Sequence, residues 1–273
     1  MRRYVFLLII LSVVGCRRDV TPAPQNEIVA DSIPDSLVAD SDTISEPAPP
    51  AAADGNFDDF VFNWMRNKNF QVQRTAFPLP VIEEGRTYIL TGKDWKHEPL
   101  FSKKDVYTMI FDNERSMKNV ADTAVKCVTV EMIRLRDQSV TAYVFVKHFG
   151  AWRMVGIKKG KLSDNKNSDF LNFYRRFASD ENFQRKHVAS SFELSVIDPD
   201  SYEHLRGTAD AGQWMSYAPE FPSDVITNVD YGQKYADTGE RVFVVSSPDG
   251  MMSSTITFKK RGSRWLAVKL DNN

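Results

Sequence analysis

The chain has 273 residues, of which 42% are hydrophobic and 26% are charged, and its formal net charge at pH 7 is −1. This length allows one or two globular domains. A charge this close to zero argues against a protein that binds nucleic acid through a basic surface, so we expect no nucleic-acid partner.

The first 16 residues have the pattern of a secretory signal. Arg2 and Arg3 supply positive charge, residues 4–14 form an apolar stretch, and Gly15 and Cys16 follow. The apolar stretch is shorter than the roughly 20 residues that a membrane-spanning helix needs, and its length is typical of the apolar core of a signal peptide. The final four residues, VVGC, resemble the lipobox of bacterial lipoproteins.

That resemblance implies a lipid anchor at Cys16. In such proteins the cysteine thiol receives a diacylglycerol, the peptide before it is removed, and the new N-terminus is acylated with a chain such as palmitate. Two or more chains hold a protein stably on a membrane. Arg17 follows Cys16 where inner-membrane lipoproteins carry Asp, which favours the outer membrane of the cell envelope and leaves the periplasmic or surface face open. The alternative is an ordinary secretory signal that happens to end near a cysteine.

Residues 17–56 read as an acidic linker. They hold eight acidic and two basic residues, six of the thirteen prolines, and neither an aromatic residue nor a lysine. Such a composition cannot bury enough apolar surface to offset the entropy of ordering the chain. We expect a disordered tether about 35 Å long on average.

The remaining chain has the pattern of one unit written twice, over residues 57–163 and 164–273. Landmarks recur in the same order at offsets of 110 to 119 residues, which predicts a tandem duplication. Each copy opens with apolar residues on one face of a helix. These residues are Phe57, Phe60, Val61, Trp64 and Met65 after the capping Asn56, and Phe170, Phe173, Tyr174 and Phe177 after the capping Ser168.

Each copy then continues into long runs with the composition of strands. The runs VKCVTVEMIRL, TAYVFVKHFG and AWRMVGIKK belong to the first copy, and RVFVVSS, MMSSTITFKK and RWLAVKL belong to the second. Turn residues separate them, for example at Gly150 and at Gly262. We expect an α+β fold in which a curved antiparallel sheet wraps around an N-terminal helix, twice.

This order of elements resembles the nuclear transport factor 2-like (NTF2-like) fold, a cone of helices set against a bent sheet. With the lipobox and the acidic linker, the whole chain is similar to an uncharacterised family of Gram-negative bacterial lipoproteins. The resemblance implies a fold and a location. It implies no activity, because cone folds of this kind serve enzymes and non-enzymes alike.

The sequence contains none of the common signatures of a metal or cofactor site. The motifs HExxH, CxxC, HxH and GxSxG are absent, as is a phosphate-binding loop. We therefore expect neither a metal nor a cofactor. Cys127 lies in a strand-like run and is expected to be a buried, inert thiol rather than a reactive one. The four histidines are scattered without ligand spacing, and one of them, His148, is expected to be a satisfied sheet residue rather than a base.

A few polar groups could still carry chemistry. Asp112 and Glu114 follow a strand-like run and could project into a cone as proton-transfer groups, although solvated turn carboxylates explain them better. The basic clusters at 158–161 and 259–261 fit solvated strand ends better than a phosphate or polysaccharide site. Among the aromatic residues, Trp95 and Trp214 occupy matching loops, where an indole could grip a ligand or plug the open end of its own cone.

Three functions remain open from the sequence. The favoured one is an envelope lipoprotein that is not an enzyme and binds a small ligand or an envelope protein. The second is a small-molecule enzyme that transfers protons or hydrolyses its substrate with a carboxylate inside one cone. The third is a structural or assembly protein of the envelope.

Overall fold

A computed structural model of the chain describes residues 54–122, 124–198, 200–233, 235, 238–248 and 250–272. The predicted signal peptide, Cys16 and the predicted linker as far as residue 53 lie outside the described residues. Over the part of the chain that the structure describes, none of the helices combines the length and the apolar character that a membrane crossing requires.

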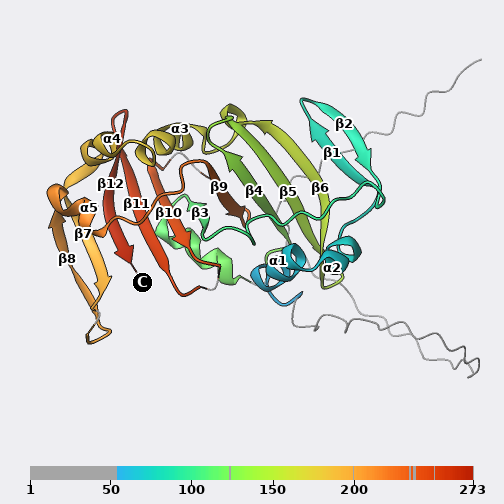
Figure 1. Cartoon of the computed structure of the whole chain (residues 1–273), viewed down its shortest axis with the longest axis horizontal. Coiled ribbons are helices and arrows are strands. Elements are labelled where there is room, and N and C mark those ends of the chain that lie inside the picture. The colour runs from blue at the N-terminus through green and yellow to red at the C-terminus, as the bar shows by residue number, and fades with distance from the viewer. Residues whose placement is uncertain are drawn as a thin grey trace, which may run out of the picture. The chain divides into compact units, whose positions relative to one another are not determined.

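Two six-stranded sheets organise the described chain (Figure 1). The first sheet has the order β2-β1-β6-β5-β4-β9, and the second has the order β8-β7-β12-β11-β10-β3. The strands of the first sheet are β1 (Leu79–Glu83), β2 (Arg86–Leu90), β4 (Cys127–Arg134), β5 (Ser139–His148), β6 (Ala151–Lys161) and β9 (Val225–Asp230). Those of the second are β3 (Tyr107–Phe111), β7 (Val188–Ile197), β8 (His204–Asp210), β10 (Glu240–Ser246), β11 (Ser253–Arg261) and β12 (Arg264–Asn272).

The two sheets exchange one strand. β3 belongs to the first half of the chain and pairs with β10, whereas β9 belongs to the second half and pairs with β4. Apart from this exchange the sheets have the same order, with β2 and β8, β1 and β7, and β6 and β12 in matching places. Each sheet is therefore completed by the other half of the chain, across the predicted boundary at residue 163.

Short helices accompany each sheet. In the first half these are α1 (Phe57–Arg66), α2 (Lys68–Gln73) and the 3-10 helices η2 (Glu114–Ala121) and η3 (Leu162–Asp164). In the second half they are α3 (Ser168–Phe177), α4 (Glu181–Lys186), the 3-10 helix η4 (Ala211–Gln213) and α5 (Trp214–Tyr217).

The helix α1 has the apolar face that the sequence predicts. All five of its predicted residues are buried, and Asn56 caps it by accepting a hydrogen bond from the backbone N–H of Asp59. In the second half the prediction of the cap is wrong. α3 begins at Ser168 itself, and the preceding Asn167 makes no side-chain cap, because its side-chain oxygen accepts from Arg241 instead.

Two large hydrophobic cores lie on the inner faces of the sheets, the faces that pack against α1 and α3. The core around α3 also takes in Ile133 and Val140 from the opposite face of the first sheet. The opposite face of each sheet is called the outer face below. The six long strands predicted from the sequence are all present, as β4, β5, β6, β10, β11 and β12.

A pair of threonines joins the two sheets where the exchanged strands β3 and β9 meet. The backbone N–H of Thr108 donates to Thr227 Oγ1 over 2.7 Å, and Thr227 N–H donates to Thr108 Oγ1 over 3.0 Å. Each hydroxyl donates in turn to the other residue's backbone carbonyl, over 2.5 and 2.9 Å. These reciprocal bonds give the junction a local two-fold symmetry.

Candidate functional site

Large ring side chains fill the interior of both halves. On the first sheet, Phe60, Trp64, Phe145 and Trp152 are at most 2% exposed, and their rings contact one another edge-on or stacked. On the second, the rings of Phe170, Tyr174, Phe177 and Trp214 are at most 1% exposed. The inner faces are therefore occupied by packed aromatic side chains.

Trp95 and Trp214, the ligand-binding candidates from the sequence, lie in separate halves and in different surroundings. Trp214 is fully buried at the start of α5 and packs on Phe177 and Phe192. Trp95 is half-buried and donates its indole N–H to Gln71 Oε1 over 3.0 Å. The two indoles therefore do not form one shared site, and their role in ligand binding stays a prediction.

The polar candidates from the sequence also lie apart from one another. Asp112 is 8% exposed and accepts a hydrogen bond from the hydroxyl of Ser116, so the expectation that it is a solvated turn carboxylate is wrong. Cys127 is only half-buried, and His148 is exposed at the end of β5. Glu114 lines an open hollow on the outer face of the second sheet.

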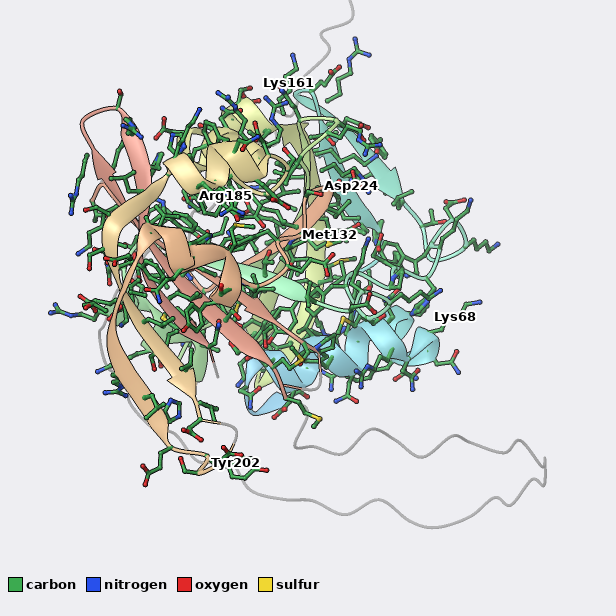
Figure 2. All side chains as sticks on the ribbon, turned by 60° about the vertical axis from the view of Figure 1, so that its left-hand side comes forward. Lys68, Met132, Lys161, Arg185, Tyr202 and Asp224 are labelled. Atoms are coloured by element: carbon green, nitrogen blue, oxygen red, sulfur yellow. The ribbon has the colours of Figure 1, made fainter. Side chains whose placement is uncertain are left out.

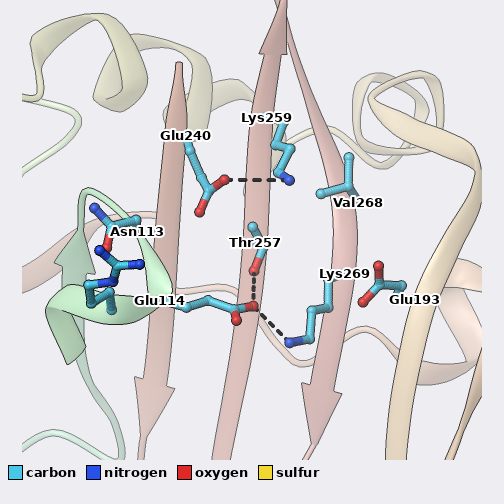
Figure 3. A pocket seen from close by; sticks show the side chains of 9 residues that line it. Asn113, Glu114, Glu193, Glu240, Thr257, Lys259, Val268 and Lys269 are labelled. Atoms are coloured by element: carbon cyan, nitrogen blue, oxygen red, sulfur yellow. Dashed lines mark hydrogen bonds and ion pairs between the residues drawn. The ribbon is translucent and has the colours of Figure 1, made fainter. Parts of the chain in front are cut away.

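That hollow, the second-sheet hollow, has a volume of about 470 Å³ and charges that pair with one another (Figure 3). Glu114 Oε1 lies 2.7 Å from Lys269 Nζ, and Glu240 lies 3.5 Å from Lys259. The hydrogen bond from Lys269 is the main reason that the pKa of Glu114 is lowered from its ordinary value. Two of the three acids that line this hollow, Glu114 and Glu240, therefore already have basic partners, and the third is Glu193.

A second open hollow, the first-sheet hollow, has a volume of about 430 Å³ and lies on the outer face of the first sheet. Its floor is made of the short side chains of β4, β5 and β6, and its rim carries lysines and acids. The lining residues are Thr129, Glu131, Val140, Ala142, Val144, Lys158, Lys159, Gly160, Lys161, Asp164, Asn165, Lys166 and Asp230.

Glu131 is the central acid of the first-sheet hollow, and two amides hold its carboxylate. Asn165 Nδ2 donates to Oε1 over 2.9 Å, and Asn228 Nδ2 donates to Oε2 over 2.8 Å. Asn228 is fully buried, gives its second amide hydrogen to the hydroxyl of Tyr235, and accepts from the backbone N–H of Ile110. Both side-chain atoms of Asn228 are thus engaged, which fixes the orientation of the Glu131 carboxylate.

Burial changes the ionisation of this carboxylate. Desolvation raises the pKa of Glu131 above its ordinary value, against the opposing effect of the amide hydrogen bond from Asn228, and the nearby Asp230 raises it further. Among the described residues, none of the ion pairs includes Glu131. A carboxylate held by neutral amides at the edge of a hollow keeps lone pairs for a further donor.

Lysines occupy the opposite side of the first-sheet hollow. Lys158 and Lys161 are exposed and form no ion pair with any residue that the structure describes. Figure 2 shows Lys161 at the end of β6, where it projects into solvent. Lys159 instead bonds to Glu83 and Tyr88, and Lys166 lies 3.5 Å from Asp230. Apart from the Lys166–Asp230 pair, the described lining of the first-sheet hollow therefore presents two acids, Glu131 and Asp164, and two exposed ammonium groups.

The equivalent place in the second half is apolar. Glu131 pairs with Asn228 across β4 and β9, and the same strand positions in the second sheet hold Val244 and Met109. Val244 is buried in a small cluster that Met117 and Val120 of η2 cover. Sequence reasoning missed Glu131, and the signal that could have found it is this replacement of an apolar pair by a polar one between the two copies.

The described acids, histidines and cysteine do not gather at a metal site: over the ranges that the structure covers, no group of three or more such residues could hold a metal ion.

Comparison with known proteins gives a family and a solved fold. The family model described as a domain of unknown function (DUF4348) matches residues 36–272. A crystal structure of an NTF2-like protein from Bacteroides fragilis NCTC 9343 is similar to this chain with a TM-score of 0.76 and 33% sequence identity, over 83% of this chain and 99% of that one. Among curated proteins none matches. The expected fold is confirmed: the chain has an NTF2-like α+β fold with two curved sheets.

Proposed function

The chain belongs to the DUF4348 family, and from that premise we propose that it is a lipid-anchored envelope protein that binds a small ligand in the first-sheet hollow without catalysis. Cys16 would carry the anchor, and the acidic linker would hold the folded part away from the membrane. The outer membrane is the proposed location, because Arg17 stands where an Asp would favour retention in the inner membrane.

The observation that carries the binding proposal is the setting of Glu131. A half-buried carboxylate costs free energy through desolvation unless a partner compensates it, and here its fixed partners are neutral amides. It borders a hollow of about 430 Å³, within the range of roughly 300–1,000 Å³ that is usual for ligand sites. A bound ligand with a positive group would supply the missing partner.

The absence of catalysis is supported by what fills the cones. Ring side chains occupy both inner faces, which is where the sequence placed a proton-transfer carboxylate. The lining of the first-sheet hollow contains no His, Cys or Ser, so it does not hold the common Ser–His or Cys–His pair of nucleophile and base.

The anchor is tested by replacing Cys16 with Ser and separating cell membranes from soluble proteins. We expect the wild type in the membrane fraction with the mass of an acylated chain, and the variant without the lipid mass. A Cys16→Ser protein that stays in the membrane at the wild-type mass would contradict the anchor.

The binding site is tested by filling the hollow. Ala142 lies on the floor between β4 and β6, so Ala142→Trp places an indole in the hollow while leaving the inner core unchanged. The full chain, purified in detergent, is assayed by thermal shift against amino acids, dipeptides, sugars, nucleotides and fatty acids. We expect at least one class to stabilise the wild type and not the variant. If no compound stabilises the wild type, the binding proposal is wrong.

One observation favours a second candidate, an enzyme in which Glu131 acts as a general base. A carboxyl group with a raised pKa at the edge of an open hollow suits proton transfer. The two candidates differ under Glu131→Gln. A non-catalytic site loses affinity, whereas an enzyme would bind its substrate and fail to convert it, as product analysis by mass spectrometry would reveal.

A further inference from the structure

Building on the proposed function, we infer that the ligand of the first-sheet hollow is a small zwitterion, an amino acid or short peptide. Its ammonium group pairs with Glu131, and its carboxylate pairs with Lys158.

Glu131, Ala142 and Lys158 form one row across the sheet. Glu131 of β4 stands opposite Ala142 of β5, and Ala142 stands opposite Lys158 of β6. The neighbouring Tyr143 and Ile157 are in the inner core, so the alternation of side chains places all three residues of the row on the outer face. All three line the hollow.

The row sets a distance that suits a zwitterion. Neighbouring strands lie about 4.8 Å apart, so Glu131 and Lys158 stand roughly 10 Å apart at the backbone. A ligand bridging them needs two charge-assisted hydrogen bonds of about 2.8 Å and its own separation of charges, about 3 Å in an α-amino acid, which gives a span of roughly 9 Å. The flexible lysine side chain can accommodate the longer span of a dipeptide.

The signs of the remaining charges exclude simpler ions. A free anion would meet the Glu131 carboxylate, and a free cation would meet Lys158 and Lys161. At the rim, Asp230 and Lys166 are already joined over 3.5 Å and add little net charge, and the carboxylate of Asp164 is exposed to solvent. A ligand with both signs is the one that gains from both sides of the hollow.

The floor leaves room for the body of such a ligand. Ala142 in the middle of the row has one methyl group, and a Cβ added to Gly160 would meet nothing within 4 Å. In the second sheet the matching row runs from Val244 through Thr255 to Asp271, so it holds neither an acid at the first place nor a lysine at the last. The row with an acid, a short floor and a lysine therefore occurs on the first sheet's outer face and not at the matching place of the second.

The probe is alanylalanine, compared with its N-acetylated form and its C-terminal amide, by isothermal titration of the full chain in detergent. We expect the free dipeptide to bind and each blocked form to bind at least about tenfold more weakly, the loss of one charge-assisted hydrogen bond. Lys158→Met should remove the preference for the free carboxylate alone, and Glu131→Gln should remove the preference for the free ammonium alone. Lys186→Met and Glu181→Gln, exposed charges on α4, are the matched controls and should change neither preference.

Blocked forms that bind as well as the free dipeptide would overturn the zwitterion inference, as would charge variants that keep both preferences. A sugar, nucleotide or fatty acid that binds the wild type and not Ala142→Trp would also overturn it while leaving the proposed binding function in place. If no compound of any class binds the wild type, both proposals fall. Circular dichroism of each variant separates loss of binding from loss of fold.

Discussion

The two sheets share one strand order and differ on their outer faces. Where the first sheet pairs Glu131 with Asn228, the second pairs Val244 with Met109 and covers them with η2. The second sheet shows that this fold is complete with an apolar pair at these positions. In the first sheet the polar pair also holds the structure together, because Asn228 accepts from the backbone N–H of Ile110. The burial of Glu131 carries a desolvation cost that the ligand proposed above would offset.

The strand exchange makes a strong prediction about how the halves unfold. Phe60 and Phe170 are equivalent helix residues, 0% and 1% exposed, and replacing either with Ala should cost about 3–5 kcal/mol of unfolding free energy. Because each sheet needs a strand from the other half, we expect both variants to shift one single transition in urea. Two separate transitions, with only the altered half moving, would mean that the halves are energetically independent.

The threonine junction should respond symmetrically. Thr108→Val removes the partners of the N–H and carbonyl of Thr227, and Thr227→Val does the reverse, so each should cost about 2–4 kcal/mol. Thr→Ser at either position keeps the hydroxyl and should cost clearly less. The costs are measured by urea unfolding. Strongly unequal costs for the two Val variants would show that the two threonines contribute unequally to stability despite their matching hydrogen bonds.

Transplanting the apolar pair into the first sheet tests the comparison directly. Asn228→Met leaves the Ile110 N–H without its acceptor and should cost about 1–3 kcal/mol, and Glu131→Val should cost a similar amount because two amides lose their acceptor. Since both variants break the same hydrogen bond, the double variant should cost less than the two single costs added together. Strict additivity in a double-mutant cycle would show that the two side chains do not act as a unit.

The smallest expected effect is a dependence on pH. The pKa of Glu131 is raised by burial, so the folded state holds a proton that the unfolded state releases. Its contribution to stability is fully present below its ordinary pKa of 4.5 and is lost as pH rises through the raised value. We therefore expect the difference in unfolding free energy, wild type minus Glu131→Gln, to decrease as the pH rises from about 4, as urea unfolding at several pH values would measure. Asp58, whose pKa burial also raises, is common to both proteins and cancels.

Local patterns allowed much of this fold to be predicted. The spacing of Phe57, Phe60, Val61 and Trp64 identifies a helix face because a helix repeats every 3.6 residues, and long runs rich in β-branched residues identify strands. The strand exchange could not be found this way. β3 and β9 are edge strands, and an edge strand with the right alternation fits either sheet equally well. Its partner is decided by contacts far away in the chain.

The candidate site was missed for a related reason. In VTVEMI, Glu131 falls on the alternate face, where an acid normally meets water. Its partners Asn165 and Asn228 lie 34 and 97 residues away, and only the folded chain brings them to it. Likewise, the loop positions of Trp95 and Trp214 match in sequence, yet one is half-buried and the other fully buried, because the surrounding loops differ.

The exchange of β3 and β9 also determines when each sheet can be completed during translation. A ribosome that has released the chain as far as residue 163 has delivered five of the six strands of the first sheet, while the edge of β4 still awaits β9 at residues 225–230. During that interval β3 has no sheet to join, and two strand edges are open to pairing with other chains. The first half of this protein cannot finish folding until most of the second half has been made.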